Sequence, residues 1–305
     1  TAEALARAVE TARHANAPRI QPVQRQADQT QAPLTLMQER IRFMDHMYPG
    51  RVVYNTPSAH RLRGPFDAAA FDHALRQLVQ RQPSLRTRIV VEHGQPLQRV
   101  HEHVDFTVPL TDLSLLDDAA REPELMRLLQ AEVDRPMDIA RAPLFRAALY
   151  RLSAQEHVFL FMPHHIVWDG WSFDLLYEEL AALYPAALDK RPATLPLPPV
   201  SYVDFAHWHH GWMASEACQQ QVAYWKAKFA GVQVPRSLPT DRARQSGMTG
   251  EGAVEWVRID TELTEALRQR AQDQGLTLNM LVMGVYAALM SQAIGVAEYQ
   301  LMESL

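Results

Sequence analysis

The chain has 305 residues, of which 47% are hydrophobic and 21% charged, a composition typical of globular proteins. Its formal net charge of -5 provides no basic surface for a nucleic acid, and the single cysteine, Cys218, excludes an internal disulfide framework. Asn279, Ser291 and Gln292 interrupt the longest apolar stretch, so no membrane-spanning helix is predicted, and the N-terminus does not have the pattern of a signal peptide. We therefore expect a cytoplasmic protein that has neither nucleic acid nor membrane as a partner.

The first 32 residues are predicted to be two short segments ahead of the globular part. Residues 1–12 have the apolar spacing of a helix. Residues 13–32 contain Pro18 and Pro22 among Gln, Arg and Asp, a composition that buries little and indicates an extended linker. The chain is therefore expected to open with the end of one unit and a tether to the next.

Helices and strands alternate along the first half of the globular part. The predicted elements are helices at 35–47, 67–80 and 122–134, a hairpin of strands 88–91 and 97–100, and strands at 144–152 and 157–162. The last strand reads HVFLFM and is apolar on both faces, which predicts a central strand covered on both sides.

The second half contains more helix. A helix at 173–183, ended by Pro185, is followed by a proline-rich crossing at 191–200, which we take as a boundary between two lobes. Further predicted elements are helices at 202–211, 216–230, 262–274 and 278–293, a loop at 238–252 and a strand at 253–259. This irregular mixture predicts an α/β or α+β fold.

Two adjacent histidines follow the apolar strand, in the segment MPHHIVWDG at residues 162–170. Neighbouring side chains at a strand end point in different directions, so at most one of His164 and His165 faces a given cleft. Asp169 and Gly170 indicate a tight turn in which a carboxylate braces the loop, and a neutral imidazole held in this way suits a general base. A purely structural histidine remains the alternative. No metal is expected, because adjacent histidines rarely reach one ion and no third ligand has helical spacing.

The segment HHIVWDG matches the HHxxxDG signature of condensation domains of nonribosomal peptide synthetases, which are related to chloramphenicol acetyltransferase. Other segments resemble motifs of that family and occur in the family's order: LTLMQERIRF at 34–43, RQPSLRT at 81–87, YVDFAHW at 202–208 and LPTDR at 238–242. By resemblance the chain is identified as a condensation domain from about Pro33 onward.

The resemblance implies an α/β (α+β) fold of two chloramphenicol-acetyltransferase-like lobes in a V around a central tunnel. It implies a first lobe at 33–191 and a partial second lobe at 192–305, preceded by the tail of an upstream carrier domain at 1–12 and a linker at 13–32. Because family members continue beyond the last predicted helix, we expect an incomplete second lobe and poor activity of this chain alone.

The implied reaction is amide bond formation between a donor acyl or peptidyl thioester and the amine of an acceptor aminoacyl thioester. Both substrates arrive on the phosphopantetheine arms of partner carrier domains. The donor carrier lies upstream, and the acceptor carrier and the adenylation domain lie downstream in the same synthetase. The domain itself is expected to bind no cofactor.

By resemblance, His165 contacts the attacking amine, either as a general base or by positioning the amine and stabilising the charged intermediate. His164 is expected to pack or hydrogen-bond beneath the site, and Gly170 to allow close approach of the backbone to the tunnel. Asp169 is expected to brace the loop through an ion pair, with Arg86 or an arginine outside this chain as its partner. Trp168 is expected to pack, with shaping of the tunnel as the alternative. The residues expected to support the site are Arg81, Arg86, Gln38, Arg40, Tyr202, Asp204 and Trp208.

In the RQPSLRT segment, Gln82 occupies a position where the family usually has histidine, which leaves the structural role of this motif intact.

Two rival functions stay open. An epimerization domain shares HHxxxDG, although the QERIRF form of the first motif favours condensation. A domain without catalytic activity that docks carriers or recruits other enzymes keeps the same fold, and the intact His164-His165 pair argues against it.

Overall fold

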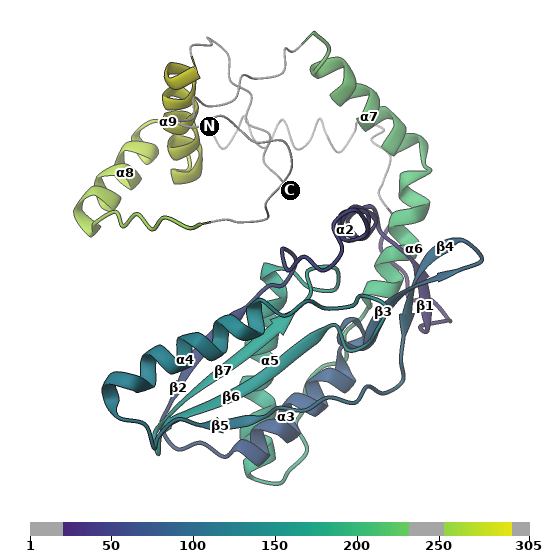
Figure 1. Cartoon of the computed structure of the whole chain (residues 1–305). Helices are drawn as coiled ribbons and strands as arrows, with labels where there is room; N and C mark the ends of the chain where they lie inside the picture. Colours follow the sequence, from purple (N-terminus) through teal and green to yellow (C-terminus); the bar gives the residue numbers. More distant parts are fainter. Residues whose placement is uncertain (1–20, 232–252, 295–305) are drawn as a thin grey trace. The chain divides into compact units, whose positions relative to one another are not determined.

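The computed structural model of the chain describes residues 21–231 and 253–294 (Figure 1). The chain divides into two compact units, Thr1–Ala223 and Tyr224–Leu305, which are described separately below. The helix predicted at 1–12 and the LPTDR segment at 238–242 lie outside the described residues. No single described helix is long and apolar enough to cross a membrane, and only the pair Thr261–Asp273 and Leu278–Ala293, bent by 98°, meets the length and composition criteria together.

A four-stranded sheet forms the centre of the first unit, with strand order β2-β7-β6-β5 (Figure 1). The strands are β2 (Ser58–Arg63), β5 (Leu110–Asp112), β6 (Phe145–Ser153) and β7 (Glu156–Pro163). Strand β7 pairs antiparallel with both β2 and β6, whereas β5 pairs parallel with β6. The prediction that the HVFLFM strand is central is therefore confirmed. Strands β2 and β5 were not predicted: β2 reads SAHRLR, which has no apolar alternation, and β5 has three residues.

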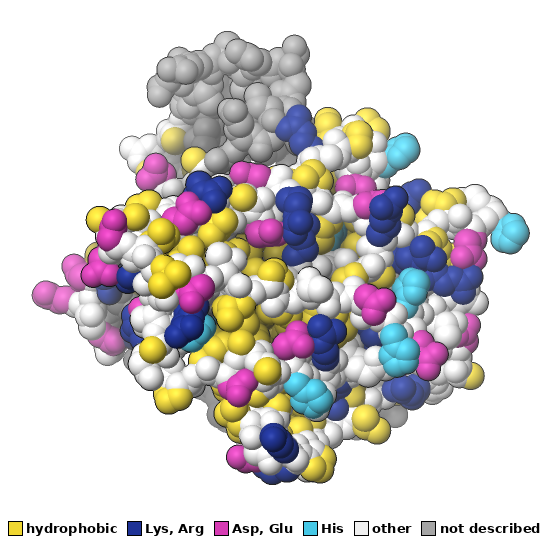
Figure 2. Space-filling model, turned by 60° about the horizontal axis from the view of Figure 1, so that its bottom comes forward, with side chains coloured by type: hydrophobic (Ala, Val, Ile, Leu, Met, Phe, Trp, Pro, Cys, Tyr) yellow, Lys and Arg dark blue, Asp and Glu magenta, His cyan; other side chains and the backbone are white. Residues whose placement is uncertain are grey.

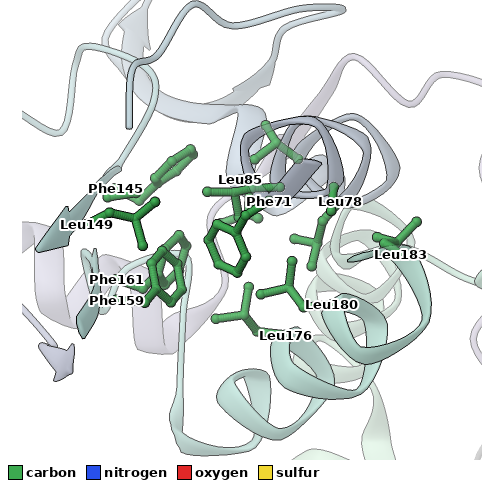
Figure 3. Close-up of a cluster of buried hydrophobic side chains, with 14 of the residues drawn as sticks. Phe71, Leu78, Leu85, Phe145, Leu149, Phe159, Phe161, Leu176, Leu180 and Leu183 are labelled. Atoms are coloured by element: carbon green, nitrogen blue, oxygen red, sulfur yellow. The ribbon is translucent and has the colours of Figure 1, made fainter. Parts of the chain in front are cut away.

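Helices cover both faces of this sheet. Helices α3 (Ala68–Arg81) and α5 (Gly170–Leu188) pack against one face, and α4 (Asp118–Val133) packs against the other (Figure 1). Because side chains alternate along a strand, Phe159 and Phe161 of β7 face α3 and α5, and Leu160 faces α4. Figure 3 shows these two phenylalanines opposite Leu176 and Leu180 of α5. Each such fully buried side chain contributes about 1.5–3 kcal/mol, so this double-sided core fixes the end of β7 from which the histidines follow.

A smaller sheet of order β1-β4-β3 lies beside α6. Its strands are β1 (Gln31–Pro33), β3 (Thr87–Glu92) and β4 (Gln95–Val100). The predicted hairpin is confirmed, and its turn residues His93 and Gly94 have φ of 51° and 80°. Positive φ at both central residues suits a tight hairpin turn.

The remaining helices of the first unit begin and end near the predicted residues. They are α2 (Leu36–Met47) and α6 (Tyr202–Met213), with α7 (Glu216–Lys228) at the junction with the second unit. Three predicted boundaries are wrong: the start of α4 and both ends of α5. Helix α4 begins at Asp118 rather than at residue 122, because Asp117 provides its N-cap. Helix α5 begins at Gly170 and continues through Pro185, whose exposed position lets the helix accommodate the missing N–H.

The second unit contains α8 (Thr261–Asp273) and α9 (Leu278–Ile294), which pack against each other. Both helices were predicted. The strand predicted at 253–259 is wrong, because residues 253–260 have no regular secondary structure and pair with no described strand. Within this segment, Val254, Trp256 and Val257 are 73%, 91% and 87% exposed.

Charged side chains of both signs are interspersed over the face of the molecule that Figure 2 shows, with apolar side chains between them. This mixture agrees with the near balance of 30 Lys and Arg against 35 Asp and Glu.

Candidate active site

The HHIVWDG segment forms a tight loop between β7 and α5. The main chain of this loop is hydrogen-bonded at both histidines: His164 N donates to Leu144 O at 2.9 Å, and His165 N donates to Tyr54 O at 2.8 Å. Within the loop, Val167 N donates to His164 O at 3.1 Å. Ile166 is 2% exposed and packs in a small apolar cluster with Leu34, Ile41, Ile89, Ile139 and Leu144. The loop is therefore fixed by its surroundings.

The two histidines lie in opposite environments. His164 is 3% exposed, and its Nδ1 accepts a hydrogen bond from Ile166 N at 3.1 Å. Burial, together with the neighbouring His165, lowers the pKa of His164 from 6.5 to about 4. His164 is consequently neutral near pH 7. Its buried ring stabilises the loop through the bond from Ile166 N.

His165 is exposed, and its ring is oriented by the loop itself. Its Nδ1 lies 2.6 Å from the carbonyl oxygen of Trp168. A carbonyl oxygen only accepts, so Nδ1 carries the proton and Nε2 of the neutral ring has a free lone pair. Nε2 makes no hydrogen bond with any residue in the described ranges. This arrangement presents a fixed basic nitrogen to the solvent side of the loop.

Trp168 is a core residue, as its expected packing role requires. It is 7% exposed and lies between Phe161 and Phe173, with ring centroids 5.2 and 5.3 Å away. Its Nε1 is buried and has no hydrogen-bond partner among the described residues.

Asp169 is the N-cap of α5. Its Oδ1 accepts from Ser172 N at 2.9 Å, and its main-chain N donates to Ser172 Oγ at 3.4 Å, so that the two residues form a capping box. Ser172 Oγ also donates to Asp169 Oδ1 at 2.6 Å. The predicted ion pair with Arg86 is not formed, because the Arg86 guanidinium donates to the carbonyl oxygens of Val79, His101 and Glu102. The carboxylate braces the loop by starting the next helix. At Gly170, a Cβ would meet no described atom within 4 Å, so packing within this unit does not require glycine there.

The first motif contacts the loop through a buried glutamine. Gln38, 2% exposed, donates from Nε2 to Ile166 O at 3.0 Å and to Gln98 Oε1 at 2.9 Å. Its Oε1 accepts from Thr35 N at 3.1 Å, within the capping box of α2. Arg40 is exposed and makes no ion pair within the described ranges. Of the Gln-x-Arg pair, only Gln38 holds the loop in this structure.

The second motif forms an ion pair with α5. Arg81 Nε donates to Glu179 Oε1 at 2.8 Å, and Gln82 Nε2 donates to the same oxygen at 2.7 Å. Gln82 therefore reinforces the pair from the position where the family usually has histidine. Both charged side chains are largely buried, and Glu179 Oε2 has no partner among the described residues.

A cavity of about 620 Å³ opens beside the loop. Its wall includes Trp168 and Ser172 from the motif region, Arg81 and Glu179 from the ion pair, and Leu197 and Tyr202 from the proline-rich crossing and α6. The cavity wall thus includes predicted residues of three motifs, whereas His164, His165 and Asp169 do not line it. Within the described ranges, no group of three or more His, Cys, Asp or Glu side chains could hold a metal ion.

A family model described as the condensation domain matches residues 28–300. The chain belongs to the condensation-domain family. A linear gramicidin synthase of Brevibacillus parabrevis is 35% identical over 277 residues, 91% of this chain and 4% of that protein. Phosphinothricin tripeptide synthetase PhsC of Streptomyces viridochromogenes is 35% identical over 88% of this chain and 25% of its own length. The condensation domain thus spans a small part of these relatives.

Solved structures of related domains have the same fold. The first condensation domain of the calcium-dependent antibiotic synthetase, in complex with a substrate analogue, matches with a TM-score of 0.75 and 26% identity over 88% of this chain and 63% of that one. The X-domain in its complex with OxyB from teicoplanin biosynthesis matches with a TM-score of 0.77 and 25% identity over 91% of this chain and 60% of that one. The predicted α/β (α+β) class is confirmed, whereas the V, the tunnel and the boundaries at 12, 32 and 191 stay predictions.

Several contacts of the condensation domain's loop were not predicted from the sequence. Tyr54 O and Leu144 O hold the two histidines, Gln98 completes the bonding of Gln38, and Glu179 pairs with Arg81. None of these contacts had a local signal in the sequence, because Glu179 is one of three acidic residues in α5, together with Asp174 and Glu178.

Proposed function

We propose that the condensation domain forms an amide bond between a carrier-bound donor thioester and the amine of a carrier-bound acceptor aminoacyl thioester. The observation that carries this proposal is the state of His165, whose Nδ1–H is engaged by Trp168 O while Nε2 is unpaired in the described structure. A neutral imidazole nitrogen at a fixed position accepts a proton or a hydrogen bond from an attacking amine.

The proposed reaction balances without a cofactor on this domain. The acceptor nitrogen attacks the thioester carbonyl carbon, so that a C–N bond forms and the C–S bond breaks. Nε2 of His165 takes one N–H proton and passes it to the departing sulfur, which leaves as the thiol of the donor phosphopantetheine. The alternative role of His165 is to orient the amine by accepting its hydrogen bond, with the sulfur receiving the proton directly.

The partners in this proposal are an upstream donor carrier and a downstream acceptor carrier with its adenylation domain. Multidomain synthetases among the relatives support this arrangement. The likeness to the X-domain bound to OxyB supports a second candidate, a domain that recruits another enzyme. Nε2 of His165, which has no partner among the described residues, favours condensation over recruitment, because recruitment does not need a basic nitrogen.

The test uses the parent synthetase with a loaded donor carrier and a loaded acceptor carrier. Intact-protein mass spectrometry of the acceptor carrier follows the gain of the donor acyl mass. His165→Ala is compared with His73→Ala, which removes an exposed histidine on α3. We expect the gain in the wild type and in His73→Ala, and its loss in His165→Ala. No gain with any protein would contradict condensation, and an equal gain with all three would remove His165 from the mechanism.

A further inference from the structure

The segment before the first predicted lobe is hydrogen-bonded along α6. Four residues at the start of this helix and on its first turns, here called the linker clamp, make these bonds: Ser201, Tyr202, Asp204 and Trp208. Ser201 Oγ donates to Gln29 Oε1 at 2.7 Å, and Trp208 Nε1 donates to Gln21 O at 2.7 Å. Tyr202 Oη lies 3.0 Å from Thr35 Oγ1. Three residues of the YVDFAHW motif at 202–208 thus contact residues 21–35, more than 160 positions away in sequence.

Asp204 is the centre of the linker clamp. It is 0% exposed, and its Oδ1 accepts from Gln26 N at 2.7 Å and from Gln29 Nε2 at 2.6 Å. Its Oδ2 accepts from Ser201 N at 2.6 Å. Burial alone raises the pKa of this carboxyl, but the hydrogen bonds from Gln26, Ser201 and Gln29 outweigh burial and lower the pKa. The buried charge is therefore satisfied in large part by the linker itself.

Apart from the linker clamp, this segment is held at its end: Val100 N donates to Thr30 O at 2.8 Å, and Gln31 begins strand β1, which pairs with β4. Residues 21–31 include five glutamines, and only Ala32, at the end of the segment, joins an apolar cluster with Val203 and Ala206. Because polar side chains gain little from burial, the hydrogen bonds to the linker clamp decide whether residues 21–29 follow α6.

We propose that the linker clamp fixes the path of the interdomain linker and thereby sets the reach of the carrier domain that precedes it. This inference rests on the proposed function. Strand β1 anchors the chain from Gln31 whether or not the linker clamp holds. Release of the linker clamp therefore frees the residues at 21–30, about 10 residues, which lengthens the tether by at most roughly 35 Å. A shorter tether whose span matches the distance to its target raises the effective concentration of the attached substrate.

The first test measures the linker directly in the parent synthetase. Arg25 is exposed and lies next to Gln26, so limited trypsin digestion reports on the Arg25–Gln26 bond. Asp204→Asn and Trp208→Phe should each speed this cleavage about tenfold. The matched control is Trp212→Phe, because Trp212 stacks on Trp208 from the same helix but its Nε1 has no partner among the described residues. Trp208→Phe keeps an aromatic ring in the stack, which separates loss of the hydrogen bond from loss of folding. Unchanged cleavage in both clamp variants would overturn the proposal.

The second test compares two routes for the same donor group. In one, the donor is loaded on the synthetase's own upstream carrier; in the other, it is supplied as a soluble N-acetylcysteamine thioester that bypasses the linker. We expect both clamp variants to lower the carrier-route rate at least tenfold more than they lower the soluble-donor rate. An equal fall on both routes, or no fall on either, would overturn the proposal. If the wild type forms no product on either route, the proposed function fails instead, and the trypsin result still stands on its own.

Discussion

His165 and Trp168 are joined by a hydrogen bond of 2.6 Å from the ring Nδ1–H to the main-chain carbonyl oxygen of Trp168. The indole of Trp168 is packed in the core, so its carbonyl is a fixed acceptor. The core of the first unit thereby determines both the direction and the tautomer of an exposed ring.

Substituting His165 by asparagine or by glutamine tests the contributions of its two ring nitrogens separately. The amide of His165→Asn lies near the position of Nδ1, so it keeps the bond to Trp168 O but loses Nε2. We expect its condensation rate to fall by about 10²–10⁴, as far as in His165→Ala. The amide of His165→Gln reaches the position of Nε2 but accepts no proton.

Single-turnover mass spectrometry of the acceptor carrier measures all three variants. An His165→Asn rate within threefold of wild type would contradict a role for Nε2. A glutamine variant as slow as alanine indicates a general base, whereas a glutamine variant at least tenfold faster than alanine indicates positioning of the amine.

Asp169 acts as a helix cap in this structure, and substitution distinguishes a cap from an ion pair. Asparagine keeps an oxygen that accepts from Ser172 N, so the stability of the histidine loop should be preserved and the free energy of unfolding should change by less than about 0.5 kcal/mol. Asp169→Ala loses this bond and should cost about 1 kcal/mol. Urea unfolding followed by tryptophan fluorescence measures both. A loss in Asp169→Asn equal to that in Asp169→Ala would show that the charge, not the cap, is what the fold uses.

Replacing Gln38 by methionine should destabilise the first unit because three buried polar groups lose their partner. These are the main-chain oxygen of Ile166, the side-chain oxygen of Gln98 and the main-chain nitrogen of Thr35. Each unsatisfied buried group costs about 1–3 kcal/mol, so we expect a loss of about 3 kcal/mol or more in the free energy of unfolding. Arg40→Met, on the exposed side of the same helix, is the control and should change it by less than about 0.5 kcal/mol. Similar losses in the two variants would mean that the Gln38 bonds contribute nothing specific.

The buried ring of His164 predicts a pH dependence of stability. Its pKa is about 4 in the folded protein and 6.5 in the unfolded chain, so between these values the unfolded state binds more protons. The free energy of unfolding therefore falls as the pH falls from 6.5 to 4, by roughly 3 kcal/mol in total. His164→Asn keeps an acceptor for Ile166 N and does not titrate, so its loss over this range should be smaller by that amount.

Urea unfolding at several pH values between 4 and 7 tests this difference, with His73→Asn as the control on an exposed surface. Other titrating groups are common to the proteins and cancel in the comparison. If the free energies of unfolding of wild type and His164→Asn depended on pH in parallel, the lowered pKa of His164 would be contradicted.

The sequence predicted the elements whose pattern is local. The apolar run of β7 predicted a covered central strand, and the 3.6-residue spacing of α3 predicted an amphipathic helix. Strand β2 was missed because its partner is β7, about 100 residues away, and its own residues SAHRLR carry no alternation. The strand predicted at 253–259 failed for the converse reason: its residues favour a strand, but strand formation requires a partner.

In the candidate site, too, the features with a local sequence pattern were predicted, and the contacts between distant residues were not. The exposed histidine and the buried one were expected from adjacent positions at a strand end. The bond between Gln38 and Ile166 joins residues 128 positions apart, so no local pattern predicts it. Asp169 was expected in an ion pair with Arg86 or with an arginine outside this chain. Arg86 bonds to main-chain oxygens instead, and Ser172, three positions on, supplies the donors that Asp169 accepts from within the described structure.

The bonds between α6 and residues 21–29 have a consequence for building hybrid synthetases. A junction at residue 33, where the globular part was predicted to begin, would join α6 to a foreign linker and leave the carboxylate of Asp204 without Gln26 and Gln29. A junction upstream of Gln21 transfers the helix together with the segment that it binds. The unit to exchange therefore begins within the linker that composition predicts at 13–32. The linker and α6 should be transferred together.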